Sequence, residues 1–437
     1  ATAGRTERFS MKICMFTNTY LPHVGGVARS VERFSADLRD LGHDVLVVAP
    51  VFPGTASGES EDGVLRVPAI QNFNGSDFSV RITLPFLIST RIGEFRPDVI
   101  HSHHPYLLGD AALHMARRRE CPLLFTHHTL YEKYTHYVPL DSETLKRFVI
   151  HLSTRYANFC DGVAAPSRSL AELITRRGVT APIREIPTGV DLQYFENGRG
   201  DRFRNVHGIP PGTPVVGHVG RLAPEKNLGF LARAAAAFLK EGDGLFLVIG
   251  AGPAGEEIRR VFENEHMADR LFLAGEKTGQ DLADGYAAMD IFAFASKTET
   301  QGMVLVEAMA AGKPVIALDA SGTREVVTDG RNGRLLQEDA PPAVFAGALE
   351  DFFRDTGKAV FWRKEALKTA RDFSRRTCAR RLFDFYEESL AAYSPARVGA
   401  AEFRNWENLL RALRAEWDLL AGKAGALADS FGKNSPR

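Results

Sequence analysis

Short apolar strands alternate with longer amphipathic segments along most of the chain, and this alternation runs twice. In the first run, strand-like stretches such as residues 12–17 and 44–49 are separated by helical patterns such as GVARSVERFSADLRDLG. A breaker-rich passage at 196–214 interrupts the order, and VVGHVG, LFLVIG, LFLAGE, DIFAFA and PVIALD then follow with helices between them. Strand–helix alternation gives mostly parallel sheets covered on both faces. The sequence therefore predicts an α/β fold of two facing Rossmann-like domains, with ligands at the carboxyl ends of the strands in an interdomain cleft.

The predicted domain boundaries follow from the same pattern. Residues 1–10 are polar and precede the first strand, so we interpret them as a leader or a cloning remnant. The first Rossmann-like domain is predicted over 11–205 and the second over 206–380. Residues 381–437 are predicted to be C-terminal helices. The last of these is amphipathic, because apolar residues recur every three or four positions at Phe403, Trp406, Leu409, Leu410, Leu413, Trp417 and Leu420.

Charge and apolar patterning narrow the partners and the compartment. Lys plus Arg and Asp plus Glu number 54 each, so the net charge is zero and no nucleic-acid partner is expected. The four cysteines are scattered without a CxxC pair, which favours a reducing compartment. No apolar run approaches the roughly 20 residues that span a bilayer, and the first residues carry no apolar signal segment. We expect a cytoplasmic protein, in peripheral contact with the inner leaflet of the cell membrane if its acceptor is a lipid.

The stretch LFLVIGAGPAGEEIRR contains Gly-x-Gly-x-x-Gly after a predicted strand, as dinucleotide-binding domains do. Two observations oppose an NAD- or FAD-dependent oxidoreductase. The motif follows the second strand of its domain instead of the first, and Glu256 and Glu257 would compete with a pyrophosphate for the helix amides. Glu276 has a suitable spacing for a ribose-binding acid, so this alternative stays open. The other interpretations are a tight turn that needs glycine and a nucleotide-contacting loop of another kind.

Two stretches combine anion-binding features with the end of a strand. In TYLPHVGGVARSVE, Gly25 and Gly26 lie between a strand and a helix, where backbone amides and the helix dipole attract an anion. In GRLAPEKN, Arg221 and Lys226 supply a forked cation and a point cation, the combination that a diphosphate needs. The simpler alternatives are an ordinary glycine turn and two solvated charges.

The stretch ETQGMVLVE places two carboxylates, Glu299 and Glu307, on either side of a predicted helix start. Eight helical residues would separate them by about 12 Å. That exceeds the roughly 5–9.5 Å of a glycosidase carboxylate pair, so we expect the two to bind different parts of one elongated ligand, such as a sugar ring and a ribose. The amides of Gly302, Met303 and Val304 can donate to a phosphate or a sugar hydroxyl. The alternative is a pair of solvated glutamates.

Histidines and tyrosines crowd the end of the predicted strand in LLFTHHTLYEKYTHYVP. We expect them to contact substrate, with a satisfied structural cluster as the alternative. A zinc site is disfavoured, because no Asp or Cys falls at ligand spacing. The chain also contains no Asp-x-Asp motif, so no metal and no other cofactor is expected.

Taken in order, Gly25-Gly26, His128, GRLAPEKN and the E-x7-E run followed by AMAAGKPVIA resemble family 4 of the retaining glycosyltransferases, over roughly residues 11–395. This resemblance implies the two-domain GT-B fold. Within the family, HHTLYEKYTHYVP and SKTETQGMVLVEAMA resemble the bacterial diacylglycerol glucosyltransferases. The implied donor is a nucleotide hexose, UDP-glucose, and the implied acceptor is diacylglycerol. A mannosyl- or glucuronosyl-type transferase acting on another lipid or a soluble glycan is the alternative, and a non-catalytic nucleotide-sugar-binding protein is a third.

The resemblance also implies roles for individual residues. Gly25 and Gly26 would approach the donor phosphate, and His128 would contact the donor sugar. Arg221 and Lys226 would hold the pyrophosphate and stabilise the departing nucleoside diphosphate. These two cations and the helix N-termini would replace a metal ion.

Glu299 would contact the hydroxyls of the transferred sugar, and Glu307 would bind the ribose. The other implied contacts are Gly250, Gly252, Pro253, Gly302, Met303 and Val304 to the donor and His127, Tyr131, Tyr134 and Tyr137 to the acceptor. Thr300 and Gln301 depart from the proline and phenylalanine that many members carry after the first glutamate. This departure fits the lipid-modifying subgroup and weakens any transfer of sugar preference from mannosyl relatives.

The family is thought to transfer with retention, by attack on the face that the leaving phosphate vacates, with that phosphate taking the proton of the acceptor. Catalysis would then depend on positioning and on stabilisation of the leaving group. The donor base, the sugar, the number of sugars added, the oligomeric state and the role of the helix at 400–437 stay open at this level.

Overall fold

The computed structural model describes residues 10–23, 25–52, 55, 58–60, 63–70, 80–81, 85–133, 142–395, 406 and 408 of the 437-residue chain. Residues 1–391 form one compact unit and residues 392–437 a second. In the second unit, Trp406 and Asn408 are helical, and the rest of the predicted amphipathic helix lies outside the described residues. The predicted leader, apart from Ser10, also lies outside them.

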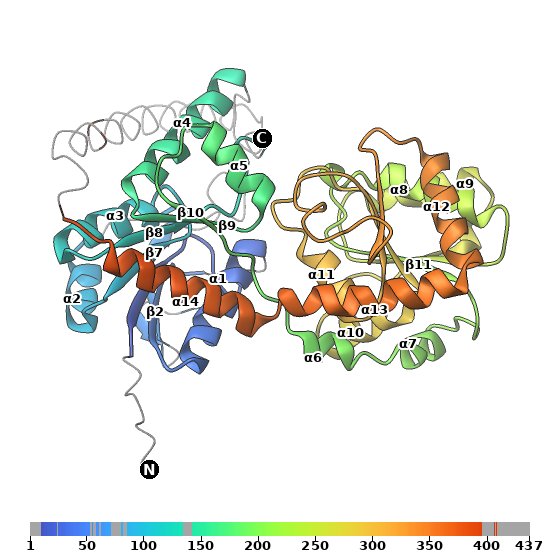
Figure 1. The fold of residues 1–437 in the computed structure, drawn as a ribbon, viewed down its shortest axis with the longest axis horizontal. Coiled ribbons are helices and arrows are strands. Elements are labelled where there is room, and N and C mark those ends of the chain that lie inside the picture. Colours follow the sequence, from blue (N-terminus) through green and yellow to red (C-terminus); the bar gives the residue numbers. More distant parts are fainter. Residues whose placement is uncertain are drawn as a thin grey trace, which may run out of the picture. The chain divides into compact units, whose positions relative to one another are not determined.

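The first sheet has β1 at its centre and runs in the order β10-β9-β8-β7-β1-β2-β4-β3 within the described residues (Figure 1). Its pairs are parallel except β3 with β4. The strands are β1 (Lys12–Phe16), β2 (Asp44–Pro50), β3 (Gly58–Ser60), β4 (Val64–Val67), β7 (Val99–Ser102), β8 (Leu123–Thr126), β9 (Gly162–Ala165) and β10 (Ile183–Glu185), and β5 (Ala69–Ile70) and β6 (Val80–Arg81) pair separately. The helical segments are α1 (Gly26–Asp40), α2 (Pro85–Phe95), α3 (Leu108–Arg119), η2 (Tyr131–Lys133), α4 (Glu143–Phe159) and α5 (Arg168–Arg176).

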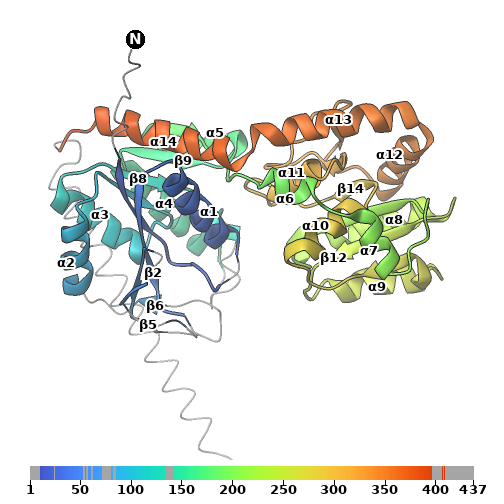
Figure 2. The ribbon, with the colours of Figure 1, turned by 90° about the horizontal axis from the view of Figure 1, so that it is seen from below.

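The last described helix of the first unit, α14 (Arg375–Ala391), packs on this first sheet although it follows the whole second sheet in sequence (Figures 1 and 2). Its buried residues Cys378, Leu382, Phe385 and Tyr386 share one core with strand residues such as Ile13 and with the inner side of α1. Tyr386 also forms a hydrogen bond of 2.6 Å to His101 Nδ1 on β7. Helix α14 is therefore part of the core of the first sheet.

The second sheet is parallel throughout and runs in the order β13-β12-β11-β14-β15-β16. Its strands are β11 (Val215–Val219), β12 (Leu245–Ile249), β13 (Leu271–Leu273), β14 (Ile291–Phe294), β15 (Val315–Leu318) and β16 (Gly333–Leu336). The helical segments are α6 (Leu192–Glu196), α7 (Gly200–Val206), η4 (Pro224–Lys226), α8 (Leu228–Leu239), α9 (Gly255–Asn264), η5 (Ala268–Arg270), α10 (Gly279–Ala288), α11 (Met303–Ala310), α12 (Pro342–Arg354) and α13 (Thr356–Asp372).

Successive residues of these central strands enter opposite cores, which explains why the strands are apolar throughout. On β12, Phe246 and Val248 face the core shared with α8, α9 and α12. Leu247 and Ile249 face the core shared with α6, α10 and α11. Side chains alternate across a strand, so a strand that is covered on both faces needs apolar residues at every position. The predicted fold of two parallel-sheet Rossmann-like domains is confirmed.

Both sheets have a point where the strand order reverses. In the first sheet, β1 lies between β2 and β7, and in the second sheet β11 lies between β12 and β14. The loops that leave the two central strands at such a point run in opposite directions and leave room for a ligand. The loops after β1, β11 and β14 contain the glycine, cationic and carboxylate motifs of the sequence.

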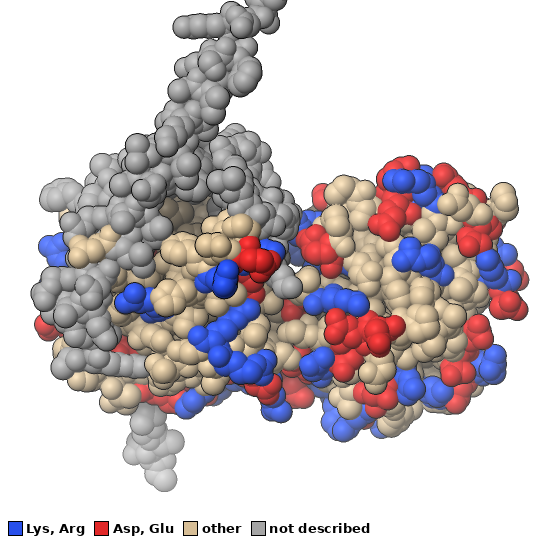
Figure 3. Space-filling view, turned by 90° about the horizontal axis from the view of Figure 1, so that it is seen from above, with Lys and Arg blue, Asp and Glu red and all other residues tan. Residues whose placement is uncertain are grey.

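On the face drawn in Figure 3, the described basic and acidic side chains are intermingled.

Candidate active site

The loops after β11 and β14 bring a predicted cation and a predicted carboxylate into contact. Lys226 Nζ donates to Glu299 Oε1, and both side chains are about four-fifths buried, at 20% and 18% exposure. The loop is shaped by η4, which starts at Pro224, and by Asn227, which adopts φ +56° and donates from Nδ2 to the Ala295 carbonyl at 3.3 Å. Each charged group is thus the counterion of the other.

Arg221 lies on the same loop but is more exposed, with 53% of its side chain accessible. Its guanidinium pairs with Glu225, four residues along the chain. The structure thus places both predicted cations at the carboxyl end of β11, each neutralised by a glutamate.

A buried histidine lies on β11, the strand that leads into the loop of Lys226. His218 on β11 is within 3.1 Å of the Ala293 carbonyl through Nδ1 and is only 1% exposed. Burial is the main cause that lowers its pKa to about 4, and Lys226 lowers it further while the Ala293 contact and Glu299 oppose the shift. His218 is therefore a neutral group at neutral pH. The sequence analysis did not select it, because a single histidine in an apolar strand is typical of a core residue.

The segment after β14 turns sharply into α11 at a glycine. Gly302 caps this helix at φ +67°, and a Cβ there would lie 2.8 Å from the Gly322 carbonyl oxygen. Glycine is favoured here, because the left-handed conformation is costly for other residues and the close approach of the Gly322 carbonyl leaves no room for a Cβ. The helix begins only at Met303, so half of the run between Glu299 and Glu307 is non-helical.

A side chain at the start of α11 reaches the first turn of α1. Gly25 caps α1, and a Cβ placed on Gly26, its first residue, would lie 3.9 Å from Met303 Cε at the start of α11. The first amides of a helix have no acceptor within the helix, and both macrodipoles are positive at this end. Two adjoining helix N-termini form a favourable environment for an anion such as a diphosphate.

Glu307 is held by groups from two different elements. Tyr286 on α10 donates its hydroxyl to Oε2 at 2.9 Å, and Arg33 on α1 lies 3.6 Å from Oε1. Burial, and then the Glu307 charge, raise the pKa of Tyr286, so its hydroxyl keeps the proton that it donates. Arg33 also donates to the Gly189 carbonyl at 3.0 Å. Glu307 is thus an oriented, 5%-exposed carboxylate that faces different partners from Glu299.

The histidines that follow β7 and β8 form a connected cluster. His103 Nδ1 and His128 Nε2 are 2.9 Å apart, and the two rings stack at 5.2 Å. Burial is the main cause that lowers the pKa of both rings well below 6.5, and neighbouring histidines add to the effect. Both rings are therefore neutral at neutral pH, and one of the two facing nitrogens donates a hydrogen bond to the other. Sequence reasoning identified His128 and missed this partner.

His127 and Tyr131 approach each other, with ring centroids 5.6 Å apart. The His127 Nδ1 atom and the Tyr131 hydroxyl are buried, and neither has a hydrogen-bond partner among the described residues. Unpaired buried polar atoms are uncommon in proteins. Tyr134 and Tyr137, predicted to belong to the same acceptor-binding group, lie outside the described residues.

The Gly250–Pro253 turn packs closely against the loop after β11. Gly250 and Gly252 have φ of +141° and +145°. A Cβ on Gly250 would lie 1.9 Å from the Gly220 carbonyl oxygen, and one on Gly252 would lie 2.4 Å from that of Leu222. The Gly250 amide already donates to the Gly275 carbonyl at 2.9 Å. The close packing explains the two glycines, and the turn supports the backbone that carries Arg221, while the donor contacts of Gly250, Gly252 and Pro253 stay a prediction.

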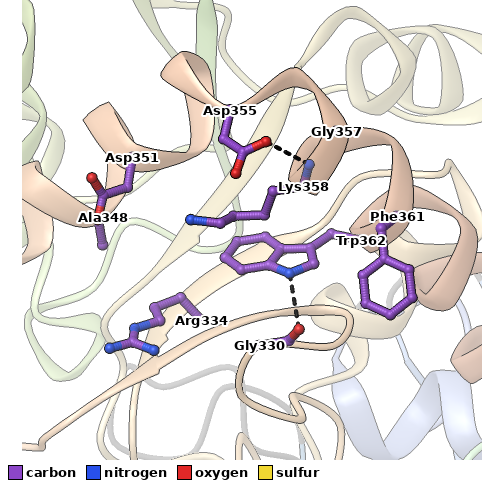
Figure 4. Close-up of a pocket in the computed structure, with 9 residues that line it drawn as sticks. All are labelled: Gly330, Arg334, Ala348, Asp351, Asp355, Gly357, Lys358, Phe361 and Trp362. Atoms are coloured by element: carbon purple, nitrogen blue, oxygen red, sulfur yellow. Dashed lines mark hydrogen bonds between the residues drawn. The ribbon is translucent and has the colours of Figure 1, made fainter.

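A surface pocket in the described part of the chain lies elsewhere, between α12, α13 and the turn before β16 (Figure 4). Trp362 donates from Nε1 to the Gly330 carbonyl at 3.1 Å, and the Lys358 ammonium lies 5.8 Å from the indole centroid. Other lining residues include Arg334, Asp351 and Phe361. None of the predicted site residues lines this pocket, so the strand-end loops remain the candidate site. No group of three or more His, Cys, Asp and Glu side chains among the described residues is arranged to hold a metal ion.

The sequence matches two protein families over adjoining ranges. Residues 24–194 match the family described as Glycosyltransferase Family 4, and residues 200–369 match the one described as Glycosyl transferases group 1. The GDP-mannose-dependent alpha-mannosyltransferase of Mycobacterium tuberculosis is 33% identical over 75% of this chain and 84% of its own length. The chain belongs to glycosyltransferase family 4.

A second relative of this family 4 glycosyltransferase is the alpha-monoglucosyldiacylglycerol synthase of Streptococcus pneumoniae, 30% identical over 74% of the chain and 75% of that protein. Among solved structures, Anabaena Alr3699/HepE in complex with UDP superposes with a TM-score of 0.70 at 21% identity, over 86% of this chain and all of that one. This likeness confirms the GT-B fold. Family membership favours glycosyl transfer over the oxidoreductase alternative.

Proposed function

We propose that this glycosyltransferase transfers glucose from UDP-glucose to diacylglycerol at a membrane surface, with retention of the anomeric configuration. The observation that supports nucleotide-sugar binding most directly is the approach of the Met303 side chain, at the start of α11, to the first turn of α1, with the Lys226–Glu299 pair on the loops that adjoin α11. Relatives named alpha-monoglucosyldiacylglycerol synthase, from Streptococcus pneumoniae and Acholeplasma laidlawii, support the lipid acceptor. None of the described helices has the length and apolar character of a membrane-spanning segment.

The proposed reaction uses the site without a metal ion. The diphosphate lies against the amides of Gly26, Gly302 and Met303, and Lys226 turns from Glu299 to the phosphate. Glu299 is then free to accept hydrogen bonds from the sugar hydroxyls, while Glu307 binds the ribose. The bond from the anomeric carbon to the phosphate oxygen breaks as the acceptor oxygen bonds to that carbon, and the phosphate takes the acceptor proton. Positive charge and aligned amides stabilise the leaving diphosphate.

A screen of donors tests this function. The protein is incubated with UDP-glucose, UDP-galactose, UDP-glucuronate or GDP-mannose, with and without diacylglycerol in detergent micelles, and the released nucleoside diphosphate is measured. The proposal expects release from UDP-glucose that depends on diacylglycerol. Turnover with a soluble sugar acceptor alone would overturn the lipid assignment, and a flavin absorbance band would revive the oxidoreductase alternative.

A second candidate is a GDP-mannose-dependent mannosyltransferase. It is favoured by the Mycobacterium tuberculosis relative and by a protein of the same name from Mycolicibacterium smegmatis, which is 35% identical over 75% of this chain. The same screen separates the two, because this candidate expects release of GDP from GDP-mannose and none from UDP-glucose.

A further inference from the structure

Gln301, one of the two residues that depart from the common family pattern, forms a two-point contact with the backbone of Thr188. Its Oε1 accepts from the Thr188 amide at 2.8 Å, and its Nε2 donates to the Thr188 carbonyl at 2.7 Å. Gln301 is 7% exposed and Thr188 is 4% exposed. The two residues are 113 positions apart in the sequence. A phenylalanine at position 301 could make neither bond.

Thr188 lies on the segment that leads from the first sheet to the second. This segment runs beside the returning segment before α14, because Val190 donates to the Phe373 carbonyl at 2.9 Å and Arg375 donates to Val190 at 3.2 Å. Gly189 permits the approach, since a Cβ there would lie 2.4 Å from the Arg375 Cα. Gln301 therefore attaches the loop that contains Glu299 and Gly302 to the two segments that connect the sheets, which are themselves hydrogen-bonded to each other.

The side chain of Thr188 extends the connection to α1. Its Oγ1 atom lies 2.7 Å from Ser30 Oγ, and both hydroxyls are buried. Ser30 lies one turn into α1, after Gly25 and Gly26, while Gln301 immediately precedes the cap of α11. Thr188 is thus bonded to α1 through Ser30 and to the loop before α11 through Gln301.

We propose that Gln301, Thr188 and Ser30 form a positioning bridge that sets the spacing between the N-termini of α1 and α11 for the diphosphate of the donor. The proposal rests on the proposed function for its ligand. The bridge residues do not touch the reacting atoms. They act by fixing the position of the start of α11 relative to α1, and positioning of this kind controls the rate of the chemical step.

Three variants and one control separate this bridge from general packing. Gln301→Leu keeps the size of the side chain and removes both hydrogen bonds to Thr188, while Gln301→Glu keeps an acceptor for the amide. The double variant Ser30→Ala/Thr188→Val removes two hydroxyls that satisfy each other, so no buried polar group is left unpaired by the change. Gln337→Leu makes the same substitution as the first variant at an exposed position of the same domain and serves as the control.

The kinetic readout is kcat for sugar transfer, measured together with the dissociation constant of the nucleoside diphosphate. For Gln301→Leu we expect kcat to fall ten- to hundredfold, with a smaller loss for Gln301→Glu. The double variant should lose about tenfold in kcat while its melting temperature stays close to that of the wild type. Gln337→Leu should match the wild type. Wild-type kcat in both Gln301→Leu and the double variant would overturn the proposal.

Hydrogen–deuterium exchange of the ligand-free protein provides a test that needs no turnover. The Thr188 amide should exchange at least tenfold faster in Gln301→Leu than in the wild type, and Gln301→Glu should retain protection. Unchanged exchange at Thr188 would show that the bridge does not hold in solution. If the wild type transfers no sugar from any donor, the proposed function fails, and this exchange measurement still decides whether the bridge exists.

Discussion

At the scale of single residues, three charged side chains of the candidate site each form an ion pair with a glutamate. Lys226 pairs with Glu299, Arg221 with Glu225, and Arg33 with Glu307. A buried charge without a counterion is costly, so the loss of one partner of a buried pair would leave the other uncompensated. A diphosphate that binds here must offer Lys226 a better partner than Glu299, which favours a ligand that carries both negative charge and hydroxyl groups.

Lys226→Ala tests the cation that we assign to the leaving group. Removing one group that stabilises developing negative charge typically lowers kcat by about 10²- to 10³-fold, and we expect a loss of this size. Steady-state kinetics of nucleoside diphosphate release measure it. Lys364→Ala, at an exposed position on α13, should leave kcat within twofold. A Lys226→Ala enzyme with kcat near that of the wild type would contradict the assignment.

At the scale of elements, the two ends of α11 carry glycines in the same backbone conformation but in different surroundings. Gly302 has φ +67° and Gly312 has φ +70°. A Cβ on Gly312 would meet only Leu367 side-chain atoms at 3.9 Å, whereas a Cβ on Gly302 would meet the Gly322 carbonyl oxygen at 2.8 Å. The pair therefore separates left-handed strain from steric conflict.

Gly302→Ala should lower the free energy of unfolding by more than about 2 kcal/mol, and Gly312→Ala by only about 1 kcal/mol, the strain of a left-handed alanine. Urea unfolding measures both values. Gly302→Ala should also weaken nucleoside diphosphate binding, because the amides at the start of α11 move. Equal destabilisation by the two substitutions would contradict the steric account.

The central strands were predictable from the sequence because an apolar core covers each face of their sheet. Apolar runs such as VVGHVG and DIFAFA correspond to β11 and β14, since every residue of a doubly covered strand is buried. The short edge strand β16 was not predicted, because Arg334 is exposed and the run of apolar residues is too short to separate from a turn. Gly302 and the cation–carboxylate motifs were recognisable because their chemistry is local.

Contacts between distant residues could not be predicted in this way. The Gln301 amide was visible as a departure from a pattern, yet its partner is a backbone group 113 residues away. The His103–His128 pair joins the ends of two different strands, and nothing in the spacing of either histidine specifies the other. The apolar positions of α14 indicate a helix with one buried side, but periodicity does not say which sheet that side covers.

At the scale of the whole molecule, the core of the first sheet is completed by α14, the last described helix of the first unit. Leu382 is fully buried in that core, whereas Leu390 on the same helix is 42% exposed. Leu382→Ala should lower the free energy of unfolding by about 2–5 kcal/mol. Leu390→Ala should change it by less than about 0.5 kcal/mol. Chemical denaturation measures both, and similar values for the two leucines would contradict the packing of α14.

The buried histidines make stability depend on pH. Burial lowers the pKa of His101 and His104 to about 3 and that of His127 to about 4. In the unfolded chain these groups titrate near 6.5, so below that pH the unfolded state binds protons that the folded state excludes. Acidification therefore favours unfolding. Between pH 7.5 and pH 5.5, urea unfolding should show a loss of roughly 1 kcal/mol for each such histidine, and a constant or rising free energy would contradict this account.

The return of α14 to the first sheet has a consequence during synthesis. The strands of that sheet are complete once residue 185 has been made, but the helix that covers Ile13 and its neighbours ends at residue 391. A ribosome that adds about 5–20 residues per second needs on the order of 10–40 s for the intervening segment. During that time one apolar face of the first sheet lacks the helix that covers it. Folding of the first core is therefore completed only after α14 has been synthesised.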